Sequence, residues 1–523
     1  MSKASKRLRI SGVMFVLGAV MIAGCASLPT SSEPDTIVVG MAHPFGSLDP
    51  AGALADGSTT LQAQVFGRLM TSTLGGSSVR PELAETARFT APTEFTVTLR
   101  PGLRFANGDR LTSSDVLFSI QRLRAMKVPG SAASFLGNLA SVSAPDAHTV
   151  VFHLTVPNDQ TFARVLSTVA GTVVDARVFS AHALTANQSI VARRAFSGRY
   201  FIDSYAPTLI TLSINALYHG GSGAAKSNIA VKSYTDPLAM QLDLHDGVID
   251  VAGTGLTSDD VARVAVDSRL RAVDQPGLQI RAIVFDAAAM PFGSAQPDAS
   301  PARALAVRRA VAELVDRPAL VAPVNGDAVA ALYSYVPEGV ASLANVLKSG
   351  FGNGSGGPGP DQAAATLFAA NVKTPVALSL FHGQDQASID EFALLKAQLE
   401  AGGLFAVTNG APPSTRKPPG ASEVIWSPPV ADPDAYLQQA VTWSDSSPPA
   451  ARAQLAAGLV AELGDADPTA RLAQLNTIED ELSAQLFVIP LVRGVQVAAT
   501  VTGIRGLSWD GSSALVYGGL YRS

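Results

Sequence analysis

The stretch that most constrains the fold is residues 81–123, which read as a strand, a tight turn and a capped helix in one unbroken unit. Phe95, Val97 and Leu99 alternate with polar residues. A period of two is typical of a strand that buries one face. A Pro-Gly pair at residues 101–102 predicts the turn that ends this strand.

The second half of this stretch predicts the helix. A short strand is expected around Leu103 and Phe105, and the Asn-Gly pair at residues 107–108 predicts a further turn. Thr112 and Asp115 have the spacing of a capping box, with Asp in place of the usual Glu. Apolar residues then follow at helical spacing, at Val116, Leu117, Ile120 and Leu123. None of these side chains is chemically reactive, so the unit indicates a scaffold rather than a reaction.

Length and charge narrow the class of protein. A chain of 523 residues exceeds what one hydrophobic core supports, so two or three domains are expected. Hydrophobic residues make up 47% and charged residues 15%, which excludes a wholly disordered chain. The net charge is -5, and it becomes -9 without the basic first 24 residues. We therefore expect no nucleic-acid partner.

The N-terminus predicts export and a lipid anchor. A basic segment precedes an apolar run at residues 13–22, which is too short to be a good membrane span and suits a signal peptide. The run leads to Ile-Ala-Gly-Cys, which resembles the lipobox of bacterial lipoproteins. That resemblance implies removal of residues 1–24, lipidation of Cys25 and a tether at 25–34. The alternative is an uncleaved anchor with an ordinary buried cysteine.

Motifs for metal binding and catalysis are missing. The seven histidines form no H-E-x-x-H or similar pair, and the single cysteine allows no internal disulfide. The chain has no G-x-S-x-G elbow and no Walker loop. Asp432 and Asp434 flank a proline, which favours a turn over a pair of catalytic acids. We expect no metal, no cofactor and no enzymatic activity.

Several landmarks in a fixed order resemble the bacterial extracellular solute-binding proteins of the oligopeptide, dipeptide and nickel class, which serve ABC importers. Besides residues 81–123, they are residues 47–50 (SLDP), 197–200 (SGRY), 246–251 (DGVIDV), 307–317 (VRRAVAELVDR) and 432–437 (DPDAYL). The resemblance implies an α/β, two-lobed periplasmic-binding-protein-like (type II) fold, with an extra subdomain in the first lobe and a hinge between the lobes.

The resemblance also divides the chain. It implies a first lobe at 35–70, 180–290 and 465–523, a first-lobe subdomain at 71–179 and a second lobe at 291–464. The hinge crossings are expected near residues 279–292 and near Asp465. Residues 293–305 read as an inserted surface loop.

Ligand-binding residues follow only from the family pattern. The first-lobe contacts would be Ala42, His43, Pro44 and Phe45, the hinge-strand contacts Gln279 and Arg281, and the second-lobe contacts Trp426, Pro429 and Asp432. Trp426 would stack on the ligand, or it would pack in the core at a strand end.

Pro429 is a departure from the family pattern. Peptide-binding relatives place an aspartate at this position, where its carboxylate pairs with the α-ammonium of the ligand. Proline has neither charge nor a backbone N–H, so it cannot form this ion pair. Either another acid such as Asp432 or Glu423 substitutes, or the ligand has no free amino terminus there.

The expected function is that of a lipid-anchored, monomeric substrate-binding protein on the outer face of the cell membrane. It would capture a peptide or a similar polar or amphipathic solute by lobe closure and deliver it to an ABC permease with its ATPase. The alternative is an envelope lipoprotein on the same scaffold, with a regulatory or interaction role and no transport ligand.

Overall fold

The computed structural model describes residues 36–523, except for 55–57, 74–78, 322–328, 342, 353–357, 385, 411–419, 429 and 445–448. The predicted leader at 1–24, the tether at 25–34 with Cys25, and Pro429 therefore lie outside the described residues. Among the helices that are described, none combines the length and the hydrophobicity needed to cross a bilayer.

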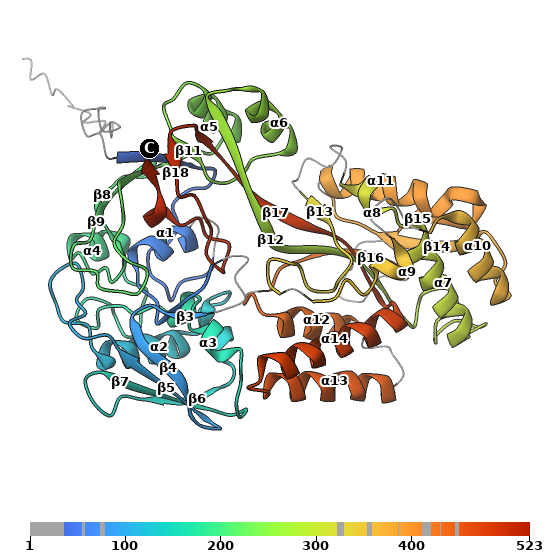
Figure 1. Ribbon diagram of the computed structural model, residues 1–523, viewed down its shortest axis with the longest axis horizontal. Helices are drawn as coiled ribbons and strands as arrows, with labels where there is room; N and C mark the ends of the chain where they lie inside the picture. The colour runs from blue at the N-terminus through green and yellow to red at the C-terminus, as the bar shows by residue number, and fades with distance from the viewer. Residues whose placement is uncertain are drawn as a thin grey trace, which may run out of the picture.

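One mixed sheet of eleven strands runs through the molecule (Figure 1). Its strand order is β15-β14-β16-β12-β17-β11-β1-β10-β9-β8, and β13 also pairs with β17. The strands are β1 (Thr36–Met41), β8 (Tyr200–Tyr205), β9 (Leu209–Ile214), β10 (Asn228–Ser233), β11 (Val251–Ala252), β12 (Leu270–Phe285), β13 (Val329–Ala331), β14 (Val376–Phe381), β15 (Phe405–Asn409), β16 (Ala421–Trp426) and β17 (Val488–Val501). The predicted α/β fold class is confirmed.

The long antiparallel strands β12 and β17 join the two halves of the molecule, as Figure 1 shows. Their register shifts between Pro276 and Ile280, so that residues 277–279 of β12 lie opposite the single residue Gly494 of β17. Such a bulge bends and twists the strand that carries the extra residues. Gly277 is required here because a Cβ at this position would lie 2.8 Å from the Gly494 carbonyl oxygen.

The first half contains β1 and β8–β11. Its helices are α1 (Ser58–Val65), α4 (Asn187–Ala192), α5 (Pro237–His245) and α6 (Ser258–Val266). Apolar side chains from β1, such as Ile37 and Val39, are fully buried in the core beneath the sheet. This half also has two antiparallel two-stranded sheets, one of β2 (Met70–Thr71) with β3 (Arg80–Pro81) and one of β18 (Ile504–Arg505) with β19 (Tyr521–Arg522).

A separate four-stranded sheet, of order β4-β5-β7-β6, forms a subdomain with its own core. Its elements are β4 (Ala84–Ala91), β5 (Glu94–Leu99), α2 (Ser113–Met126), the 3-10 helix η1 (Ala132–Leu136), β6 (Leu139–Ser143), β7 (Thr149–Leu154), α3 (Phe162–Val165) and the 3-10 helix η2 (Val169–Gly171).

The predicted strand and helix of residues 81–123 are confirmed. Strand β5 buries every second residue, and Thr112 and Asp115 form the capping box of α2. The predicted strand around Leu103 and Phe105 is wrong. The structure has only an isolated bridge between Arg104 and Arg110, because the turn at residues 107–108 closes too soon for a longer ladder.

The second half consists of strands β14–β16 and several helices. These helices are α7 (Pro301–Leu314), α8 (Arg317–Leu320), α9 (Lys348–Phe351), α10 (Pro360–Ala369) and α11 (Gln386–Glu400). Helices α12 (Pro433–Trp443), α13 (Pro449–Leu463) and α14 (Pro468–Gln485) stack on one another beside the subdomain (Figure 1). The described residues also form the 3-10 helices η4 (Ala401–Gly403) and η5 (Tyr517–Gly519).

The prediction of a loop at residues 293–305 is wrong for residues 301–305, which are helical. Helix α7 begins at Pro301, where Ser300 caps the helix by accepting a hydrogen bond from the Arg303 N–H. The numerical boundaries of the lobes stay a prediction.

Candidate functional site

A cavity of about 290 Å³, here called the central cavity, lies where the two halves meet. Side chains from both halves, from the subdomain and from the two long strands line it. They are Leu54, Thr59, Phe135, Thr168, Val169, Leu278, Gln279, Ser427, Pro428, Gln496, Ser512 and Ser513. A ligand bound here would contact both halves at once.

The bulge between β12 and β17 shapes one wall of the central cavity. Leu278 and Gln279 are two of the three bulged residues, and β16 pairs with β12 only from the Trp426–Ile280 pair onward. The Tyr436 hydroxyl donates a hydrogen bond to the Leu278 carbonyl oxygen at 2.5 Å. This bond satisfies a carbonyl that the bulge leaves out of the ladder, so it holds the wall in place.

A second cavity of about 390 Å³, here called the side cavity, shares Phe135 with the first. It lies between the subdomain and helix α12. Its lining residues are Ser134, Phe135, Thr161, Val165, Trp426, Val430, Asp432, Asp434, Ala435, Gln438, Gln439 and Thr442. Because one ring contributes to both cavities, we treat them as neighbouring parts of one site.

Trp426 packs against other aromatic rings and also lines a cavity. Its ring meets Tyr436 edge-on, with the ring centres 5.2 Å apart, and meets Trp443 in the same way at 5.8 Å. It also lines the side cavity and is only half-buried. The ring is therefore fixed by packing and still presents a surface to the cavity.

Asp432 connects the subdomain to the helical layer. Its side chain is 2% exposed and accepts hydrogen bonds from Arg164 Nε at 3.0 Å and from Arg471 at 2.7 Å. It also caps α12 by accepting a hydrogen bond from the Asp434 N–H. Arg471 pairs in addition with Glu462 at 2.7 Å. The charge of Asp432 is thus neutralised within the chain.

Two further carboxyl groups beside this network share a hydrogen bond. Burial, the largest cause, raises the pKa of both Asp434 and Glu462 above their ordinary values. Within the described part of the chain, no group of three or more His, Cys, Asp or Glu residues is placed to hold a metal ion.

Three of the residues expected to bind ligand lie in these cavities. Gln279 lines the central cavity, and Trp426 and Asp432 line the side cavity. Pro429 lies outside the described residues, but its neighbours Ser427 and Pro428 line the central cavity. A role for each of them in binding stays a prediction.

The other expected residues lie outside both linings. Ala42 donates its N–H to Thr254, the His43 carbonyl accepts a hydrogen bond from Ser233, and the Phe45 ring faces Tyr205. Pro44 is exposed between them. Arg281 is buried and forms an ion pair with Glu391 at 2.6 Å, so any ligand contact would first have to break this pair.

Sequence reasoning missed most of the lining. Thr59, Gln496 and Ser512 belong to no motif that the sequence displays, and neutral polar residues of this kind occur all over protein surfaces. Only the fold brings them together.

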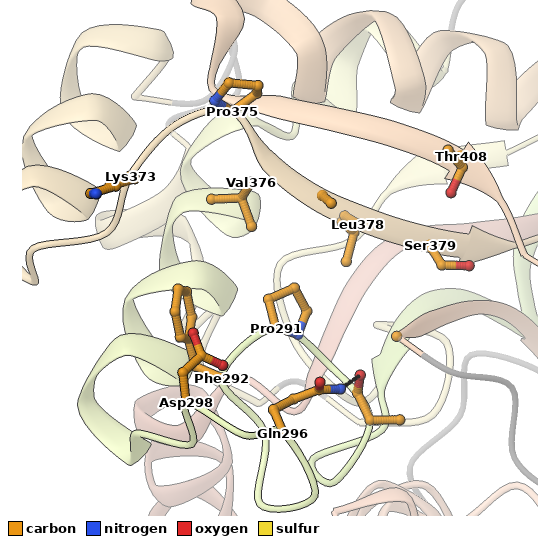
Figure 2. A pocket seen from close by; sticks show the side chains of 13 residues that line it. Pro291, Phe292, Gln296, Asp298, Lys373, Pro375, Val376, Leu378, Ser379 and Thr408 are labelled. Carbon is orange, nitrogen blue, oxygen red and sulfur yellow. Dashed lines mark hydrogen bonds between the residues drawn. The ribbon is translucent and has the colours of Figure 1, made fainter.

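A third cavity, of about 430 Å³, lies entirely within the second half (Figure 2). Pro291 and Phe292 lie on one side of it, and Val376 and Leu378 of β14 lie on the other. The described residues that line it come from the segment after β12, from β14 and β15 and from the loops beside them, and none comes from the subdomain or from β1 and β8–β11, so a ligand here would not bridge the two halves. The central cavity is the better candidate.

A comparison with protein-family models identifies the chain. Residues 78–448 match the model described as bacterial extracellular solute-binding proteins, family 5, middle. The chain belongs to this family. The match spans more than half of the 523 residues and includes the subdomain, the long strand β12 and the second half as far as helix α12.

Individual relatives are more distant. The probable D,D-dipeptide-binding periplasmic protein DdpA of Escherichia coli K12 is 26% identical over 271 residues, about half of each chain. The structure of HbpA2 from Haemophilus parasuis covers 94% of this chain and 100% of its own, at a TM-score of 0.77 and 16% identity. The unliganded open form of MppA, a periplasmic murein tripeptide binding protein, covers 93% and 97% at a TM-score of 0.76 and 17% identity. These similarities confirm the type II periplasmic-binding-protein fold.

Proposed function

We propose that this family member is the substrate-binding protein of an ABC importer for peptides or similar solutes. The observation that carries the proposal is the central cavity, because residues of both halves and of the joining strands line it. Ligand contacts on both sides stabilise the closed arrangement over the open one, and that difference in affinity drives closure.

The hinge is the bulge at residues 277–279 of β12, opposite Gly494 of β17. The ladder is interrupted there, so a change in backbone angles breaks few hydrogen bonds. On this proposal the second crossing between the lobes lies along β17 rather than near Asp465.

The location and the partners belong to the same proposal. Cys25 carries the lipid that holds the protein on the outer face of the cell membrane, and the residues after it act as a tether. The protein works as a monomer and passes its ligand to a permease and its ATPase. The relative DdpA is named as a probable D,D-dipeptide-binding protein, which supports a peptide-like solute.

Native mass spectrometry tests the proposal directly. The full chain, purified in mild detergent, should carry a co-purifying small solute. Adding back that solute should decrease the radius of gyration in small-angle scattering. Protein without any bound solute, together with co-purification of envelope enzymes, would favour the alternative of a regulatory lipoprotein that transports nothing.

A further inference from the structure

The lining of the central cavity carries no charge. Seven of its residues present a hydroxyl or an amide, namely Thr59, Thr168, Gln279, Ser427, Gln496, Ser512 and Ser513, and the other five are apolar. All twelve lie within the described part of the chain. A lining of this kind offers hydrogen bonds to a ligand but no counter-ion.

Several of these polar groups are available to a ligand. For the side chains of Thr59, Gln279, Ser427, Gln496 and Ser513, the structure shows no hydrogen bond to any described residue. Gln279 and Ser427 are exposed, and the other three are half-buried. They come from α1, from both long strands and from the segments after β16 and after Asp510, so they surround the cavity.

Two carboxylates of the described chain that lie close to this lining are already paired. The Asp510 carboxylate, two residues before Ser512, forms an ion pair with Arg68 at 2.8 Å. Across Phe135, in the side cavity, Asp432 is held between two arginines. Because none of the twelve residues that line the central cavity is charged, a charged group entering it would lose hydration without gaining a counter-ion from that lining, and this desolvation is costly.

The alternation of apolar and amide-bearing side chains suits an amide backbone. The primary amides of Gln279 and Gln496 both donate and accept hydrogen bonds, as a peptide group does. Leu54, Val169, Leu278 and Pro428 offer apolar surface to small side chains. A volume of about 290 Å³ lies just below the range of small-molecule pockets, roughly 300–1,000 Å³, and therefore suits a small ligand.

We infer that the central cavity selects an uncharged, amide-bearing ligand of about dipeptide size, such as a short peptide with blocked termini, over the same peptide as a zwitterion. This inference rests on the proposed function and adds the class of ligand to it.

The test compares two matched pools of dipeptides built from Ala, Val, Leu and Ser. One pool has free termini, and the other is N-acetylated and C-amidated. After equilibrium dialysis against the full chain in mild detergent, mass spectrometry measures the enrichment of each pool. We expect at least tenfold stronger binding of the capped pool, which corresponds to about 1.4 kcal/mol.

A variant places a carboxylate in the cavity. Gln279→Glu should lower the preference for capped peptides by about tenfold, because the new charge can pair with a free ammonium group. Gln121→Glu makes the same change on the exposed face of α2 and should leave the ratio unchanged.

Three results would overturn the inference. They are equal or stronger enrichment of the free pool, no enrichment of either pool, and an unchanged ratio in Gln279→Glu. None of these results tests the proposed function. That function is tested separately, by the co-purified solute and by the closure that it causes.

Discussion

The Asp432 network allows a sharp test of how the subdomain is held against the second half. Asp432→Asn keeps the helix cap, since Asn caps about as well as Asp. It removes the negative charge that lies between Arg164 and Arg471, at 3.0 and 2.7 Å. One amide oxygen cannot serve both guanidinium groups, because the amide nitrogen only donates.

The magnitude follows from burial. Removing one partner of a fully buried ion pair costs about 3–5 kcal/mol. The side chains of Arg164 and Arg471 are 11% and 15% exposed, and Arg471 keeps its bond to Glu462. Because the arginines are partly exposed and one keeps another partner, the lower end of this range of about 3–5 kcal/mol applies. We therefore expect a loss of about 3 kcal/mol in the free energy of unfolding.

Urea unfolding followed by fluorescence measures this loss. With a slope of about 3 kcal/mol per molar, the midpoint should fall by roughly 1 M. Asp467→Asn is the matched control. Asp467 caps α14 in the same way, but it is exposed. Its replacement should change the midpoint very little.

Hydrogen exchange provides a second readout, because Asp432→Asn should speed exchange in α3 and α12, which lie beside the lost ion pairs, at least as much as in the distant core strand β1. The reasoning is refuted if Asp432→Asn shifts the urea midpoint no more than Asp467→Asn does. That result would mean that both arginines reach water at little cost.

Two further predictions concern a buried acid and the bulge. Burial raises the pKa of Glu479 from 4.5 to about 7, and its carboxyl oxygen accepts a hydrogen bond from Ser334. Between these pH values the folded protein keeps a proton that the unfolded chain releases, so stability falls as pH rises. Between pH 5 and pH 8, urea unfolding should show that the wild type loses about 2.5 kcal/mol more free energy of unfolding than Glu479→Gln does; equal losses would contradict this pKa. Gly277→Ala should destabilise the protein by about 1–3 kcal/mol, because the new methyl group meets the Gly494 carbonyl oxygen at 2.8 Å. Gly503→Ala is the control, because its Cβ would enter open space, and thermal unfolding with an equal effect from both would argue against a tight bulge.

The sequence by itself determined the scaffold. The alternation in β5 and the capping box of α2 depend on residues close together in the chain, so their patterns could be read directly. Ordered landmarks of the same kind indicated the solute-binding family, and the family model confirms it.

Only the tertiary structure decided the candidate site. Thr59, Gln279, Ser427 and Gln496 lie far apart in the chain, and no motif marks them. Their meeting depends on the long-range register of β12 and β17, which includes a bulge that local sequence does not specify. The partner of Arg281 could not be read from local sequence either, because its ion pair with Glu391 joins residues 110 positions apart in the chain. Local patterns determine elements, whereas the character of a cavity depends on which distant side chains the completed sheet brings together.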